Sequence, residues 1–328
     1  VTDVPTGISG FGRRHRAYVK VQDGCMLRCS FCIIPYVRPQ LSSRPIEHIL
    51  DEVLRLVDHG FREVVLTGIH LGHYGVEWNR NAAKDQWTRL SHLVRRIAEL
   101  PGEFRVRLSS IEATEVTREL IDVMADHPEK VCPHLHISMQ SGSDGVLRRM
   151  RRRWGAQRFV DRCELLKERL DRPAITTDVI VGFPGETDAE FAETVAVCQQ
   201  AGFSKIHIFP FSARRGTPAA EMPDQLPKHV KQDRSRELAA VETELRDAYY
   251  ATLQGMTLTV LVESPREAQP SERAGASPPP APFIGTSCRY APVELACTEG
   301  QVGQFVNIEA GAAENGRLTA AIQQAAIA

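Results

Sequence analysis

The chain has 328 residues, with 40 Lys and Arg against 41 Asp and Glu, and 42% of its residues are hydrophobic. The balanced charge excludes nucleic-acid binding driven by bulk charge alone, and the polar interruptions in its apolar stretches exclude a membrane-spanning helix. Eight cysteines, three of them clustered and five scattered, exclude a small secreted disulfide framework. We therefore expect a cytoplasmic protein with no membrane association.

Strands and helices are predicted to alternate through residues 16–252. A helix at 45–59, for example, carries Ile46, Ile49 and Val53 at helical spacing. The predicted strands cover 16–22, 63–66, 104–108, 134–138, 175–181 and 205–209, and the other predicted helices cover 87–99, 117–125, 144–150, 156–170, 188–201 and 228–252. Six β–α alternations with apolar strands predict an α/β fold, whose parallel sheet is covered by helices and is open or partly closed as a barrel.

Residues 253–328 have a different pattern. The segments MTLTVLVE, FIGTSCRY, PVELAC and QFVNIEA alternate apolar and polar residues with no helix between them, which predicts a small antiparallel β-barrel. Residues 265–282 are rich in Pro, Ser and Ala, which predicts a disordered surface insertion. The expected organisation is an α/β domain over 16–252 followed by a small all-β domain.

The most specific chemical motif is the CxxxCxxC spacing of Cys25, Cys29 and Cys32, directly after the first predicted strand. Thiolates are the usual ligands of iron–sulfur clusters, and three of them leave one iron of a [4Fe–4S] cluster open to a substrate or cofactor. A structural zinc ion needs a fourth ligand, for which His48, within a predicted helix, could be proposed. The spacing favours a cluster over a zinc knuckle or a chance grouping.

This motif after a first strand, with Phe31 before the last cysteine, resembles the radical S-adenosylmethionine (SAM) superfamily. The resemblance implies a partial (β/α)6 barrel. It also implies that the open iron chelates the amino and carboxylate groups of SAM. An electron from the cluster then cleaves SAM to a 5′-deoxyadenosyl radical, which abstracts a hydrogen atom, while the protein supplies geometry and excludes water.

A narrower resemblance extends over residues 25–225. The segments IIPYVRPQLSSRP, LTGIHLGHYG, LHISMQSGSDGVLRRMRRRW, ITTDVIVGFPGET and FSKIHIFPFSARRGTPAAEMPDQ are similar to the methylthiotransferase family, closest to the branch that acts on tRNA N6-threonylcarbamoyladenosine. The alternatives are isopentenyl-adenosine in tRNA, a ribosomal protein aspartate, and an iron–sulfur RNA-binding protein without catalysis. The resemblance implies tRNA as partner, an external electron donor and a monomer.

The family pattern implies which residues contact SAM. Several of them follow predicted strands, where sites of parallel sheets lie. The implied residues are Phe31, Thr67, Gly68, Ser109, Ser138, Gln140, Arg152, Asp178, Val181 and Gly182. Each residue also has a purely structural interpretation. Thr67 and Gly68 could form a plain turn, and the serines and the glutamine could be polar side chains at strand ends that are hydrogen-bonded within the protein.

The final β-module resembles a TRAM domain, an RNA-binding barrel, and Arg289 and Tyr290 are its candidate RNA contacts. Full-length methylthiotransferases begin with a further domain, whose three cysteines bind a second [4Fe–4S] cluster. No cysteine precedes Cys25 here, and residues 1–15 resemble the linker that follows that domain. We expect a fragment in preference to a shorter natural protein, with the second cluster present only in a full-length form.

Overall fold

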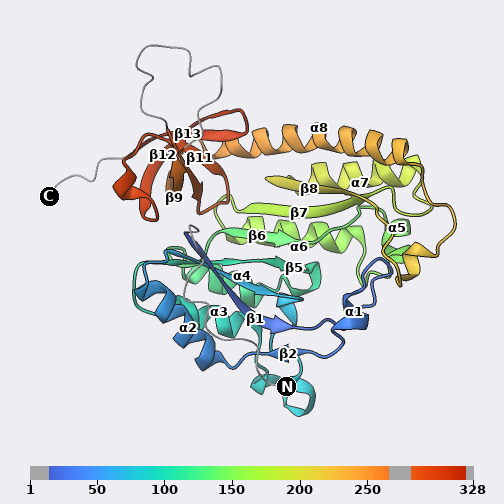
Figure 1. Cartoon of the computed structure of the whole chain (residues 1–328), viewed down its shortest axis with the longest axis horizontal. Coiled ribbons are helices and arrows are strands. Elements are labelled where there is room, and N and C mark those ends of the chain that lie inside the picture. Colours follow the sequence, from blue (N-terminus) through green and yellow to red (C-terminus); the bar gives the residue numbers. More distant parts are fainter. Residues whose placement is uncertain (1–14, 266–281, 323–328) are drawn as a thin grey trace.

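A computed structural model describes residues 15–265 and 282–322. The predicted linker at 1–15 and the predicted insertion at 265–282 therefore lie almost wholly outside the described residues. Figure 1 shows the strands of the α/β part stacked beside one another, with the β-barrel at one end, joined to them through the long helix α8 (Lys228–Leu253).

The α/β part contains two adjoining four-stranded sheets, with the strand orders β2-β1-β3-β4 and β5-β6-β7-β8. All neighbouring strands are parallel except β2, which pairs antiparallel with β1 at one edge. The bounds are β1 Arg16–Asp23, β2 Ser42–Ser43, β3 Glu63–Gly68, β4 Arg105–Leu108, β5 Ser110–Ile111, β6 His134–Ile137, β7 Ala174–Val181 and β8 Lys205–Pro210. The six predicted strands are all present, and β2 and β5 are additional.

An interruption between β4 and β5 at Ser109 separates two sheets where one was predicted. Before Ser109, the Val106 N–H donates to the Lys130 carbonyl (2.6 Å) and its carbonyl accepts from the Cys132 N–H (2.9 Å). After Ser109, β5 pairs with β6 itself. The segment from 105 to 111 thus belongs to both sheets, and the parallel layer curls at this point.

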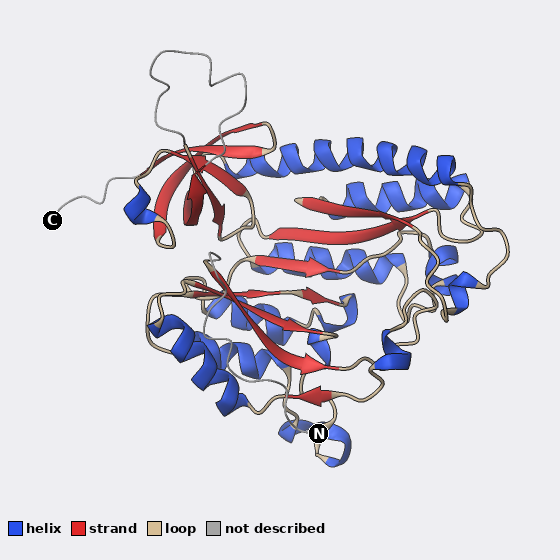
Figure 2. Ribbon diagram, viewed as in Figure 1, coloured by secondary structure: helices blue, strands red, loops and turns tan. Residues whose placement is uncertain are grey.

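Helices cover the outer faces of the sheets, as Figure 2 shows. In α2, for example, Ile49, Val53 and Leu56 are buried, as expected from their helical spacing. Helix α7 begins at a capping box between Thr187 and Glu190 and ends at Gly202, whose φ of 64° glycine tolerates. The helices are α1 Ile34–Val37, α2 Ile46–Asp58, α3 Leu90–Ala98, α4 Arg118–Asp126, α5 Asp144–Arg149, α6 Ala156–Arg169, α7 Asp188–Ala201 and α8. None of the helices in the described ranges is long and apolar enough to cross a bilayer.

The C-terminal strands form a closed five-stranded barrel with the order β10-β11-β13-β12-β9. Its core includes Leu258, Val260, Val293, Ile308 and Leu318. The prediction of a purely antiparallel barrel was wrong, because β11 and β13 pair in parallel where the barrel closes. Its strands are β9 Thr257–Pro265, β10 Phe283–Ser287, β11 Pro292–Leu295, β12 Phe305–Glu314 and β13 Arg317–Ile322.

A buried ion-pair cluster joins the barrel to the first sheet. Glu63 on β3 accepts hydrogen bonds from Arg105 (2.6 Å) and Arg107 (2.9 and 3.0 Å) on β4. The remaining N–H groups of the two arginines donate to barrel carbonyls, including Thr259 (2.8 Å) and Ser287 (3.0 Å). The carboxylate thus orients two guanidinium groups that fasten the two parts together.

Arg289 and Tyr290 lie at the same junction. Arg289 donates to the carbonyls of Asp171 (2.9 Å) and Arg172 (3.1 Å). The Tyr290 ring, in a residue that is 37% exposed, stacks on His134 at 4.7 Å. Both side chains therefore contact the α/β part, and their role in RNA binding stays a prediction.

Candidate functional site

A cavity of about 180 Å³ lies at the carboxyl ends of β1, β3, β5 and β6. Four strand ends converge there because the strands are parallel. The residues that line it are Cys25, Leu27, Cys29, Phe31, Cys32, Ile34, Pro35, Ile69, His70, Ser110, Ile111, Glu112, Ser138, Gln140 and Arg152. The cavity thus brings together the cysteine motif and part of the predicted SAM-contacting set.

The cysteine loop leaves β1 through Gly24, whose φ of +83° lies in the left-handed region. The backbone holds the loop in place: the Cys25 N–H donates to the Arg38 carbonyl (3.1 Å), and the Cys32 N–H donates to the Cys29 carbonyl (3.1 Å). Ser30 anchors its middle, with its hydroxyl donating to the carbonyl of Arg149 (2.7 Å). The three thiols are free and face one cavity.

Arg152 is the main positive charge at this cavity. Its guanidinium lies 3.5 Å from the Sγ atom of Cys29, donates to the Ser138 carbonyl (3.2 Å), and pairs with the Glu112 carboxylate. Burial raises the pKa of the Cys29 thiol, and Arg152 opposes that shift. Iron ligation requires thiolates. Three free thiols around one cavity, with a fixed cation beside them, therefore fit an anionic iron–sulfur cluster.

Four predicted SAM contacts line the cavity: Phe31, Ser138, Gln140 and Arg152. Gln140 has a φ of 67°, which a residue other than glycine adopts only when its surroundings impose it. Its N–H donates to the carbonyl of Asp178 on β7 (2.8 Å), and its own carbonyl accepts from the N–H of Ile180 (2.8 Å). Neighbouring strand β7 therefore holds Gln140 in this unusual conformation.

The other predicted contacts do not line the cavity. The Thr67 hydroxyl donates to the Val19 carbonyl (3.4 Å), and Gly68 packs closely on Gln22. Ser109 lies between β4 and β5, and its neighbour Ser110 lines the cavity instead. A one-residue shift of this kind reverses the side to which a side chain points.

Asp178, Val181 and Gly182 belong to β7 and its end. The Asp178 carboxylate lies 3.3 Å from Nε2 of His136, which supplies a polar neighbour for a carboxylate in a strand. Val181 is buried, and the Gly182 N–H donates to Glu186 (2.7 Å). Contact of these three residues with SAM stays a prediction.

Sequence reasoning missed Gln22, which is buried behind the cysteine loop. Its side-chain amide donates to the carbonyls of Asp23 (2.7 Å) and Gly24 (2.9 Å), and its carbonyl oxygen accepts from the His70 N–H (2.9 Å). One side chain therefore ties the end of β1 to the chain that follows β3. Because Gln22 continues the alternation of Arg16, Tyr18 and Lys20 along β1, no sequence signal distinguishes it from these neighbours.

Replacement of Gln22 by leucine should destabilise the loop. The buried Gly24 carbonyl and His70 N–H lose their partner, as does the part-buried Asp23 carbonyl. Each of the two buried groups costs about 1–3 kcal/mol, so the free energy of unfolding should fall by about 2–6 kcal/mol. Urea denaturation of the cluster-free protein measures this change. The control is Gln157→Leu, which removes an exposed amide that bonds to Asp161 (2.9 Å). Equal stability of the two variants would contradict the role assigned to Gln22.

Comparisons with known proteins agree with this site. The Radical SAM superfamily profile matches residues 19–198. The chain is 41% identical over 308 residues to the threonylcarbamoyladenosine tRNA methylthiotransferase MtaB of Bacillus subtilis, covering 94% of this chain and 64% of that protein. It is also 41% identical over 255 residues to the tRNA-2-methylthio-N(6)-dimethylallyladenosine synthase of Corynebacterium jeikeium, covering 77% and 50%. The chain thus spans about half to two thirds of the length of these curated relatives.

A solved structure shows the same fold at low sequence identity. The radical S-adenosylmethionine methyltransferase TsrM from Kitasatospora setae aligns with a TM-score of 0.50 and 16% identity, over 62% of this chain and 38% of that one. The superfamily profile includes the cysteine motif and the strand ends that build the cavity. The chain therefore belongs to the radical SAM superfamily and is an enzyme of that type.

Proposed function

We propose that this chain is the catalytic part of a tRNA methylthiotransferase that acts on N6-threonylcarbamoyladenosine. The observation that carries the proposal is the 41% identity to the Bacillus subtilis relative, which covers 94% of the chain. A match of that length includes most of the β-barrel as well as the α/β part. This supports an RNA-binding, TRAM-like role for the barrel, together with tRNA as the partner.

Membership of the superfamily implies a [4Fe–4S] cluster and SAM. Cys25, Cys29 and Cys32 would hold the cluster, which when bound supplies the electron for reductive cleavage of SAM. Arg152 places a positive charge next to Cys29 and is itself held by Glu112. Ser138 and Gln140 present polar groups to the same cavity. The cavity is smaller than the pockets of about 300–1,000 Å³ that enclose whole ligands, so we assign to it the cluster and the adjacent part of SAM.

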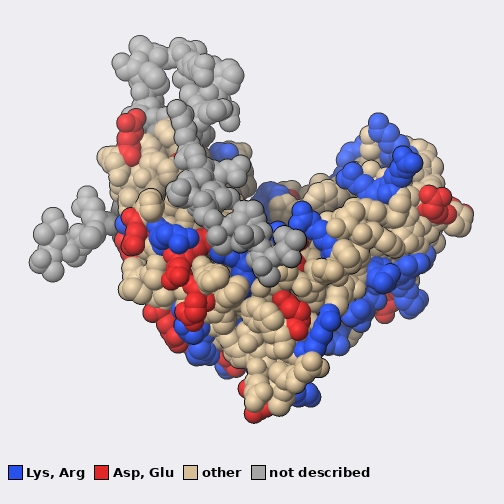
Figure 3. All heavy atoms as spheres, turned by 60° about the horizontal axis from the view of Figure 1, so that its bottom comes forward, with Lys and Arg blue, Asp and Glu red and all other residues tan. Residues whose placement is uncertain are grey.

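The surface around the cavity suits a nucleic acid. Figure 3 shows Lys and Arg side chains gathered toward the end of the molecule that carries α5 and the loop after β8. Arg148, Arg151 and Arg153 are exposed there, whereas Arg149 is paired with Glu190. The exposed aromatic residue Tyr36 follows the last cluster cysteine by four positions. Arginines for phosphates and an aromatic ring for stacking are what a single-stranded RNA loop requires.

The second candidate substrate is dimethylallyl (isopentenyl) adenosine in tRNA, because relatives with that printed activity are also 41% identical. The two substrates differ in the group on N6 of adenosine. Mass spectrometry of tRNA nucleosides from a strain that lacks the gene distinguishes them. Loss of 2-methylthio-N6-threonylcarbamoyladenosine supports the first candidate, and loss of the 2-methylthio isopentenyl nucleoside supports the second. Retention of both would contradict the tRNA proposal.

Replacement of Cys29 by alanine should abolish cluster binding and SAM cleavage together. After anaerobic reconstitution, the parent chain should contain about four iron atoms and release 5′-deoxyadenosine when reduced. The matched control is Cys297→Ala in the barrel, which removes a partly buried thiol far from the motif in sequence. It should retain both iron and SAM cleavage. Full iron content in Cys29→Ala would contradict the ligand assignment.

We further propose that the chain alone holds one cluster and that sulfur insertion needs the second. The relatives are longer than the matched region, and the five remaining cysteines share no spacing with the first three. Three of these, Cys132, Cys163 and Cys198, are buried, and burial raises the pKa of each thiol. They are poor cluster ligands. Reconstituted chain that contains markedly more than four iron atoms would contradict this proposal.

A further inference from the structure

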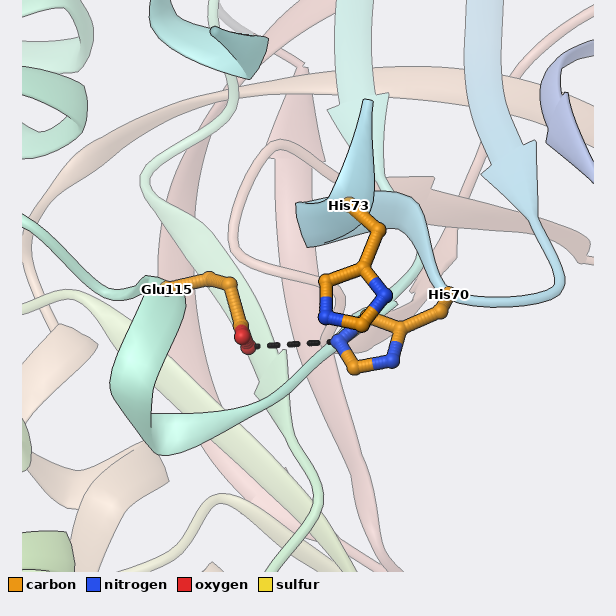
Figure 4. A group of neighbouring side chains, drawn as sticks. All are labelled: His70, His73 and Glu115. Atoms are coloured by element: carbon orange, nitrogen blue, oxygen red, sulfur yellow. Dashed lines mark ion pairs between the residues drawn. The ribbon is translucent and has the colours of Figure 1, made fainter. Parts of the chain in front are cut away.

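Next to the cysteine loop, three side chains gather their ligand-type atoms in one place. His70 follows β3, His73 ends the short helix η1 (Leu71–His73), and Glu115 ends η4 (Ala113–Glu115) after β5. One atom from each residue lies within 4.8 Å of the other two. Figure 4 shows the two imidazole rings stacked, with the Glu115 carboxylate pointing toward them.

The facing atoms are buried and poorly satisfied. Nε2 of His70, Nδ1 of His73 and Oε2 of Glu115 form no hydrogen bond within the part of the chain that the structure describes. His70 Nε2 and Glu115 Oε2 form an ion pair at 3.5 Å, which is longer than a good hydrogen bond. Buried polar atoms normally have partners, and each one without a partner needs an explanation. A bound cation would satisfy all three atoms at once.

The other polar side-chain atoms of His70 and Glu115 already have partners. Nδ1 of His70 lies 3.6 Å from the Sγ atom of Cys25, and the Thr114 hydroxyl donates to Oε1 of Glu115 (2.8 Å). With Nδ1 directed at Cys25, His70 turns Nε2 inward, where a metal ion would displace the proton of the ion pair with Glu115, and Thr114 leaves Oε2 of Glu115 available. Metal ligands are usually oriented in this way by a second hydrogen bond on their far side.

We propose that His70, His73 and Glu115 bind a divalent transition-metal ion of the zinc and iron class. Two imidazoles and one carboxylate are a donor set that such ions use, with further coordination positions left open. This site adjoins the cluster cavity, which His70 also lines, but its three ligands are not the cluster cysteines, and it does not depend on the proposed function.

The three side chains can coordinate one ion only after the His73 side chain changes its conformation. The two rings are stacked at 3.5 Å with planes 10° apart, so both can coordinate only after the His73 ring turns. His73 and Glu115 line an adjoining cavity of about 50 Å³, which provides room for that rotation and for an open coordination position.

A zinc titration of the cluster-loaded chain tests the proposal. After removal of loosely bound metal, elemental analysis should find about one zinc per chain beside the cluster iron. His73→Asn and Glu115→Gln should each weaken zinc binding by at least about tenfold, since even the loss of an outer partner costs about 10–100-fold. The matched control is His92→Asn, which removes a partly exposed histidine that pairs with Glu119 (2.9 Å) and should leave zinc binding unchanged.

A second measurement excludes zinc on the cluster thiols. The double variant Cys29→Ser with Cys32→Ser removes two cluster ligands but keeps Cys25, the partner of His70. It should still bind one Co²⁺ with an absorption spectrum of nitrogen and oxygen ligation, and added His73→Asn should abolish that spectrum. Unchanged circular dichroism shows that these variants fold. Absence of zinc in the parent chain, equal binding by His73→Asn, or loss of Co²⁺ with the cysteines would each overturn the proposal.

Discussion

Replacement of Glu63 by alanine should lower the free energy of unfolding by about 3–5 kcal/mol, the cost of breaking a buried ion pair by removing one partner. Glu63 is 0% exposed and accepts from Arg105 and Arg107, with Arg16 at 3.9 Å. Without the carboxylate, buried guanidinium groups on β4 keep their charge but lose their counter-ion. Urea denaturation measures the loss.

The same change should loosen the barrel from the α/β part. Arg105 and Arg107 donate to the carbonyls of Thr259, Thr286, Ser287 and Cys288, and Glu63 holds both arginines in the required orientation. Hydrogen exchange should therefore become faster in β9 and β10 of the Glu63→Ala variant. The matched control is Glu47→Ala, which removes an exposed carboxylate paired with Arg96 (3.1 Å) and should change stability by less than about 1 kcal/mol. Equal effects of the two changes would contradict this account.

Glu63 also gives stability a defined pH dependence. Burial alone would raise its pKa, but Arg107, Arg105 and Arg16 hold the pKa well below the usual value. The folded protein therefore keeps this carboxylate ionised at pH values where the unfolded chain binds a proton. The contribution is fully present above the unfolded-state pKa of about 4.3 and is lost as the pH falls below it. The Glu63→Ala variant should lack this part of the acid dependence.

Replacement of Gly24 by alanine should remove most of the cluster iron. A Cβ atom on Gly24 would lie 1.8 Å from the carbonyl oxygen of Gln40, and the φ of +83° disfavours any other residue. The backbone strain costs about 1–3 kcal/mol, and the chain at Gln40 must also move. That movement disrupts the bond from the Cys25 N–H to the Arg38 carbonyl. Iron content after anaerobic reconstitution measures the effect.

The control variant Gly60→Ala introduces backbone strain without a steric clash. Gly60 has a φ of +89°, but an added Cβ atom would meet no heavy atom within 4 Å. This variant should show a stability loss of about 1–3 kcal/mol from strain and should keep its iron. If Gly24→Ala also kept its iron, the shape of the cysteine loop would not depend on the contact with Gln40.

Most of the fold could be predicted from local sequence patterns. The helix at Ile46–Asp58 and the strand at Ala174–Val181 lie within one residue of their predicted bounds, because burial of one face imposes a regular spacing of apolar residues. Strands of two residues, such as Ser42–Ser43, leave no such spacing. The parallel pairing of β11 with β13 was missed for another reason, since pairing between distant strands has no local signal.

The candidate site was predictable where its residues follow one motif or one strand end. Cys25, Cys29 and Cys32 are close in sequence, and Ser138, Gln140 and Arg152 follow β6 within fifteen positions of it. Their supporting residues were not predictable. Glu112 pairs with Arg152 across 40 positions, and Gln22 bonds to His70 across 48.

The sequence by itself indicated the radical SAM chemistry of this protein, because the proposed cluster ligation depends on three thiols at a short spacing that a single loop can supply. The tertiary structure alone decided what surrounds that loop. The fold placed Ser110, and not Ser109, at the cavity, and it brought His70, His73 and Glu115 together beside Cys25. Contacts of this kind depend on distances between strands, and sequence order does not record them. The three-cysteine loop is thus a local feature, and its electrostatic surroundings are a product of the whole fold.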